Sequence, residues 1–186
     1  KELREKYADA PEIARTINAC ENDGGAGFCI CEECRALDVP GYYVDGDGEL
    51  LSLSDRYVHF WNELAIRARA VDPKAWVCGY SYSRMRKPPK QTRVEDGVML
   101  AYVGSPGYPA EPESRERFRS EWREWADLGA SQLYRPNVLH AGHANPCATP
   151  LEMGRDFQWL YEHDMIGTDY DSLLGAWSTA GPNYYV

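Results

Sequence analysis

The order of strand-like and helix-like segments constrains the fold of this chain more than any other feature. Five apolar runs have the length and residue types of β-strands, and three longer segments between them have helical periodicity. The run from Gly97 to Val103 is continuously apolar, as expected for a strand that a parallel sheet buries on both faces. The predicted strands lie within residues 13–19, 75–82, 97–103, 131–134 and 165–168.

The helices are predicted from periodicity and from capping residues. Apolar side chains recur at steps of three and four through residues 57–71, and Ser52 or Ser54 is the expected N-cap of this helix. Pro150, directly after Thr149, suits the first position of another helix. The remaining helices are predicted at 32–37 and from a Ser114 cap to Leu128, with Gly129 as the C-cap glycine.

Strands that alternate with helices indicate an α/β fold with parallel β/α units and right-handed crossovers. A dinucleotide-binding fold would carry G-x-G-x-x-G after its first strand, whereas residues 24–27 lack that spacing and precede cysteines. A barrel fits better, but a complete one needs at least about 200 residues. We therefore predict that residues 1–186 form a single partial domain, the C-terminal part (about five strands) of a TIM-type (β/α)8 barrel, with a cysteine-containing loop at 24–38.

Composition excludes some partners and leaves others open. The net charge of -9 argues against a nucleic-acid partner, because phosphate binding requires clustered Lys and Arg. No apolar run reaches the roughly 18 residues of a membrane span. The 6 Trp and 13 Tyr suit either core packing or stacking against sugar rings. Because the chain opens on Lys1 without a Met, we expect it to be a piece of something longer.

The polar end of the first predicted strand is the main candidate site. Glu21, Asn22 and Asp23 follow the apolar run, and loops after the strands of parallel α/β folds carry the chemistry. Glycoside cleavage needs an acid that protonates the leaving oxygen and a second carboxylate. We predict Asp23 as the general acid or its partner, and Glu21 or Asp169 as the other carboxylate. The alternative is that Asp23 is only a turn residue.

Glu21 is the closer partner, because residues two apart in an extended chain point to the same side. Other polar side chains follow predicted strands and are candidates for binding sugar hydroxyls or a uronate. For Arg84 the alternative is a surface charge, and for the two histidines of the loop after the fourth strand it is loop polarity. The predicted substrate-binding residues are Asn22, Tyr82, Arg84, Tyr102, His140 and Asp169.

Three of the 6 cysteines form a Cys29-x-Cys31-x-x-Cys34 cluster, whose soft thiolates suit a metal such as zinc. The predicted hydrolysis requires no cofactor, so such a zinc ion would be structural. Disulfides that pin the loop and free thiols are the other two options, and all three stay open. A fourth ligand would have to come from Cys20, Cys147, His140 or His143.

Four strings of residues resemble the bacterial domain-of-unknown-function family numbered 4838. They are 22–25 (NDGG), 28–38 (FCICEECRALD), 54–56 (SDR) and 80–82 (YSY). That family is similar to glycoside hydrolases of the hexosaminidase and α-glucuronidase type, which are TIM barrels. The resemblance implies that the five strands correspond to the fourth to eighth of a barrel, and that an oligo- or polysaccharide is the partner. It also implies a separate N-terminal half of the barrel and a secreted or periplasmic location. Two rival hypotheses are a non-catalytic carbohydrate-binding or assembly module and a metal-stabilised domain with zinc at the C-x-C-x-x-C cluster.

Overall fold

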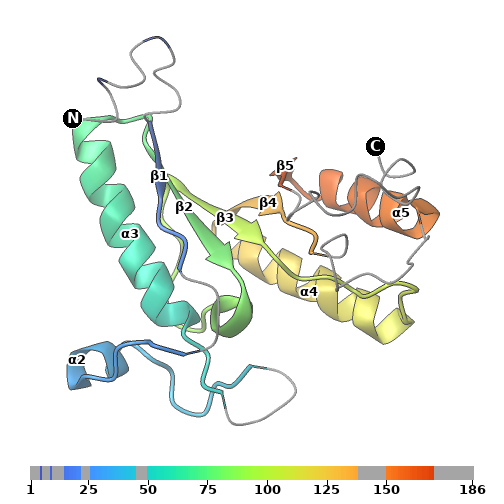
Figure 1. The fold of residues 1–186 in the computed structure, drawn as a ribbon, viewed down its shortest axis with the longest axis horizontal. Coiled ribbons are helices and arrows are strands. Elements are labelled where there is room, and N and C mark those ends of the chain that lie inside the picture. Colours follow the sequence, from blue (N-terminus) through green and yellow to red (C-terminus); the bar gives the residue numbers. More distant parts are fainter. Residues whose placement is uncertain are drawn as a thin grey trace. The chain divides into compact units, whose positions relative to one another are not determined.

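The computed structural model describes residues 5, 9, 15–21, 26–44, 50–137 and 150–169 (Figure 1). Five parallel strands form one sheet in the order β1-β2-β3-β4-β5 and alternate with helices. This confirms the predicted α/β fold and is consistent with part of a β/α barrel. The strands are β1 (Thr16–Asn18), β2 (Trp76–Ser81), β3 (Val98–Tyr102), β4 (Ser131–Tyr134) and β5 (Met165–Thr168). The helices are α2 (Glu32–Arg35), α3 (Ser54–Val71), η2 (Ser83–Met85), α4 (Pro112–Asp127) and α5 (Pro150–Tyr161).

The chain divides into two compact units, which we describe one at a time. Unit 1 comprises Lys1–Leu100 with Leu128–Ala130, and unit 2 comprises Ala101–Asp127 with Ser131–Val186. The assignment of residues 1–186 to a single partial barrel domain stays a prediction. None of the helices in the described residues has the length and hydrophobicity needed to cross a membrane.

The core of unit 1 forms where α3 packs against β2 (Figure 1). The Trp61 side chain is fully buried, and a Cβ built on Gly79 would lie 2.4 Å from its ring. Only glycine therefore allows the helix to approach the strand this closely. β1 then pairs with β2 in parallel, with Asn18 opposite Cys78.

The predicted cap of α3 is wrong. The N-cap is Leu53, whose apolar side chain cannot form a cap hydrogen bond. The hydroxyl of Ser54 donates to the carbonyl of Lys87, and the hydroxyl oxygen of Ser52 accepts the N–H of Ser54 at 3.3 Å. Asp55 is also buried, and its carboxylate accepts the backbone N–H groups of residues 90–92 at 2.8–2.9 Å. The first turn of α3 thus fixes the loop that follows β2.

Unit 2 is held together by aromatic side chains of its strands and helices. Phe118 and Trp122 of α4 pack against the ring of Tyr102, with centroids 5.8 Å apart in both pairs. The indole N–H of Trp122 donates to the carbonyl of His163 at 2.9 Å, beyond the end of α5. The Ser114 cap is a second incorrect prediction, because α4 already begins at Pro112. α5 begins at Pro150 as predicted.

Candidate functional site

The chain that leads from β1 into the predicted acidic site is held on two sides. The N–H of Ala19 donates to the carbonyl of Cys78 at 2.8 Å, which extends the pairing with β2. From α3, the indole N–H of Trp61 donates to the carbonyl of Ala19 at 3.1 Å. The next residue, Cys20, donates its N–H to the side-chain oxygen of Asn18 at 3.0 Å. The position of Glu21, the next residue, is therefore defined by β2 and α3 together.

Glu21 is one of the two predicted catalytic residues. Both of its carboxyl oxygens are buried and lack a hydrogen-bond partner in the described part of the chain. Burial raises the pKa of Glu21 from 4.5 to about 7, although its own backbone N–H opposes the shift. Such a carboxyl group is protonated in about half of the molecules at neutral pH, so it can both donate and accept a proton.

An aromatic side chain of α3 lies within electrostatic range of Glu21. Burial, and then the charge of Glu21, raise the pKa of the Tyr57 hydroxyl. The Tyr57 ring meets the rings of Phe28 and Trp61 edge to face, with centroids 5.9 and 5.7 Å apart. Sequence reasoning missed Tyr57 as a site residue because its helical spacing is equally typical of a core position.

A cavity of about 330 Å³ lies in the same unit. Arg84 reaches it from the loop after β2: its Nε donates to the carbonyl of Leu51 at 2.9 Å, and its guanidinium lies 5.3 Å from the centroid of the Phe28 ring. Burial, and then the charge of Arg56, lower the pKa of Arg84. The lining residues are Cys29, Ile30, Arg35, Asp38, Pro40, Leu51, Leu53, Arg56 and Arg84.

Arg84 is thus half-buried at the wall of a cavity, and its predicted role in substrate binding stays a prediction. Tyr82, also predicted to bind substrate, is the half-buried N-cap of η2. Its carbonyl accepts the N–H of Met85 at 2.9 Å. Asn22, Asp23 and His140 are outside the described residues.

Two predicted substrate-binding residues belong to unit 2. Tyr102 is completely buried, and its hydroxyl donates to Glu121 of α4 at 2.6 Å. This places Tyr102 in the core rather than at a surface that a sugar reaches. Asp169 follows β5 and forms an ion pair with Arg135, which follows β4. Its N–H also donates to the carbonyl of Tyr134 at 3.0 Å.

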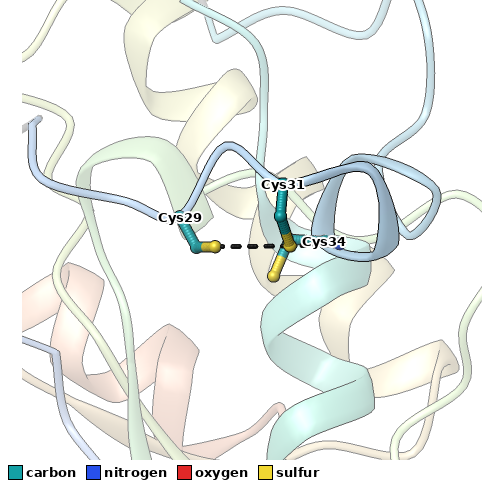
Figure 2. A group of neighbouring side chains, drawn as sticks. All are labelled: Cys29, Cys31 and Cys34. Carbon is teal, nitrogen blue, oxygen red and sulfur yellow. Dashed lines mark hydrogen bonds between the residues drawn. The ribbon is translucent and has the colours of Figure 1, made fainter.

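The predicted cysteine cluster is present in unit 1 (Figure 2). The three sulfur atoms of Cys29, Cys31 and Cys34 lie within 4.8 Å of one another, and the Cys29 thiol donates to the Cys31 sulfur at 3.5 Å. Cys31 is the N-cap of α2 and accepts the N–H of Cys34 at 3.4 Å, which is the largest cause of its pKa falling to about 7. The hydrogen bond with Cys29, followed by that with Cys31, raises the pKa of Cys34 to about 11.

None of these three thiols forms a disulfide, and neither do those of Cys20 and Cys78, so the disulfide option has no support among the described cysteines. Cys20 was one predicted source of a fourth metal ligand. Its thiol instead donates to the carbonyl of Cys78 at 3.5 Å, and Cys20 is not part of the cluster. The other predicted sources, Cys147, His140 and His143, are not among the described residues.

Comparison with known proteins gives one match. Residues 2–186 match the family described as Domain of unknown function (DUF4838). No curated protein and no solved structure matches the chain. The matched range includes the carboxyl end of β1, the cavity and the cysteine cluster, so all three belong to the family's own domain.

Proposed function

The chain belongs to the family described as Domain of unknown function (DUF4838), and on that premise we propose that it is a glycoside hydrolase-like domain. The proposed substrate is an oligo- or polysaccharide, and the reaction is hydrolysis of a glycosidic bond. The observation that carries the proposal is the buried carboxyl group of Glu21, with a pKa of about 7, at the carboxyl end of β1. A glycosidase acid must hold its proton at neutral pH, and burial is the usual way to achieve this.

We assign the general acid to Glu21 and the second carboxylate to Asp23, two residues further along the chain. In this scheme Glu21 protonates the leaving oxygen, while Asp23 acts as base or nucleophile, or orients the acetamido group of the substrate. Arg84, at the wall of the 330 Å³ cavity, would bind a hydroxyl or carboxylate group of the sugar.

We also propose that the site belongs to a larger barrel in a protein outside the cytoplasm. The five strands would supply the C-terminal part of a bacterial TIM-type barrel, and a separate N-terminal half would supply the others. We place the protein in the periplasm or outside the cell, where polysaccharides are encountered. Both points follow the resemblance to hexosaminidases and α-glucuronidases.

The test of the general acid compares leaving groups. A panel of glycosides of hexosamines and uronic acids is assayed with two aglycones each, an alkyl alcohol and dinitrophenol. Replacing Glu21 by Gln should lower kcat/KM for the alkyl glycoside on the order of 100- to 10,000-fold. The dinitrophenyl glycoside should lose far less, because dinitrophenolate departs without a proton.

The matched control is Glu63→Gln, on an exposed position of α3, which should leave both rates unchanged. Equal rates for Glu21→Gln and the unmodified protein on the alkyl glycoside would exclude Glu21 as the acid. If the protein binds oligosaccharide but no glycoside of the panel releases a reducing end, the non-catalytic binding module is the correct function.

A further inference from the structure

The segment 29–38, which carries the cysteine cluster, lacks the packing that normally stabilises a helix. It contains α2, which has four residues and buries none of them. Ile30, just before this helix, is 74% exposed. A helix this short does not persist by hydrogen bonding alone, because its nucleation is unfavourable. Packing of α2 therefore does not account for the conformation of this segment.

The three thiols of Cys29, Cys31 and Cys34 are placed to provide a cross-link. Figure 2 shows Cys29 at the start of the segment, with its sulfur directed toward those of Cys31, the N-cap of α2, and of Cys34 on α2. Their sulfur atoms lie within 4.8 Å of one another, close enough for a single ion to contact all three. Thiolates select soft or borderline cations such as Zn²⁺, and three of them leave one position for water or another ligand.

Arg56 of α3 connects this cluster to the cavity. Its Nη1 donates to the carbonyl of Cys29 at 2.7 Å, and its Nε and Nη2 donate to the carboxylate of Asp38 at 2.9 and 2.5 Å. The side chains of Arg56 and Asp38 are only 10% and 6% exposed. One guanidinium therefore fixes both ends of the segment, and Cys29, Ile30, Arg35 and Asp38 of the same segment line the cavity.

We infer that Cys29, Cys31 and Cys34 bind one Zn²⁺ ion per chain, and that this ion holds segment 29–38 as a wall of the Arg84 cavity. Zinc binds the thiolate forms, so each sulfur that still carries a proton releases it as its bond to zinc forms. The role is structural: the ion replaces the missing core of α2. It does not depend on whether the domain hydrolyses glycosides.

The first part of the test measures metal binding directly. The protein is freed of metal with a chelator under reducing conditions and titrated with Co²⁺, whose thiolate charge-transfer absorption reports sulfur ligands. One Co²⁺ per chain, displaced by Zn²⁺, is expected. Cys31→Ser should weaken binding by at least about 100-fold, because it removes one of the three ligands. Losing a residue that only orients a ligand already costs about 10- to 100-fold. Cys78→Ser, which changes a cysteine of β2 that is outside the cluster and not in a disulfide, should bind as the unmodified protein does.

The second part measures the structural effect by amide hydrogen exchange on the unmodified protein, so it does not depend on any variant folding. Adding Zn²⁺ should slow exchange in residues 29–38 at least tenfold and leave α3 and β2 unchanged. A stoichiometry well below one, equal affinity in Cys31→Ser and Cys78→Ser, or unchanged exchange in 29–38 would each overturn the inference.

Discussion

Glu21 and Asp156 both have buried carboxyl oxygens, but within the described residues only those of Asp156 have hydrogen-bond partners. Asp156 of α5 accepts hydrogen bonds from the Tyr108 hydroxyl at 3.1 Å, from Arg115 at 3.1 Å and from Arg119 at 3.4 Å. Its side chain is fully buried. Neither oxygen of Glu21 has such a donor in the described residues. Burial penalises both charges, and only the surroundings of Asp156 offset the penalty.

We interpret this difference as the distinction between a structural carboxylate, Asp156, and a candidate catalytic one, Glu21. The network of Asp156 extends through Arg115 to Glu152, whose carboxylate also accepts the N–H of Ala110 at 3.1 Å. Asp156 therefore holds the loop before α4 against α5. Glu21 holds nothing in the described structure, and its burial appears instead as a raised pKa. Unpaired burial of this kind is typical of functional sites.

The largest effect on stability is expected at Asp156. Replacing it by Ala leaves Arg115 and Arg119 without their shared anion, and removing one side of a buried ion pair costs about 3 kcal/mol. For a chain of this size that lowers Tm by roughly 6 to 12 °C. Urea and thermal unfolding followed by circular dichroism measure the change. A loss below 1 kcal/mol would mean that the network contributes little and that Asp156 resembles Glu21.

Glu21→Gln should show a smaller effect, with the opposite sign and a dependence on pH. Below about pH 4.5 Glu21 is protonated in both the folded and the unfolded chain, so it does not affect stability. As pH rises from about 4.5 to 7, the unfolded chain loses this proton while the folded chain keeps it, so the folded state becomes less stable, and the loss is complete above pH 7. Glutamine cannot ionise, so the variant should be more stable than the unmodified protein at pH 8.5.

The expected gain is about 2 kcal/mol, after allowing for the solvent that still reaches the group. Urea unfolding of both proteins at pH 4.5, 6, 7 and 8.5 measures it as a difference, which removes the contribution of other titrating groups. A constant difference across this range would show that Glu21 is not titrating near neutral pH, and the contrast with Asp156 would disappear.

The sheet was predictable from the sequence because a parallel strand buried on both faces leaves an uninterrupted apolar run, as in β3. The cap of α3 was not, because Ser54 forms its hydrogen bond with Lys87, 33 positions away. The burial of Tyr102 was not predictable for a related reason. Its position at the end of β3 is visible in the sequence, but the face to which it points depends on contacts with Glu121.

In the candidate site, too, the sequence predicted local patterns but not contacts between residues far apart in the chain. The pattern of an apolar run followed by acidic residues identified Glu21, and the C-x-C-x-x-C spacing identified the thiols that the structure brings together. The burial of Glu21 depends on tertiary packing, and no local pattern encodes it. Nor did the sequence show that Arg56 fixes both ends of segment 29–38, since its two partners, Cys29 and Asp38, are far from it along the chain.

The smallest effect is expected at an exposed ion pair of α4, which gives the baseline for the two buried carboxyl groups. Glu116 pairs with Arg123, and their side chains are 66% and 46% exposed. Glu116→Gln should cost about 0.5 kcal/mol and leave the cation–π contact of Arg123 with Trp159 in place. The loss should vanish in 1 M salt, which screens exposed charges, whereas the loss in Asp156→Ala should persist. Urea unfolding at low and high salt gives both values. If the two variants lose the same free energy of unfolding, or respond equally to salt, then exposure does not distinguish these carboxylates. The burial of Glu21 without partners in the described residues would then no longer indicate function.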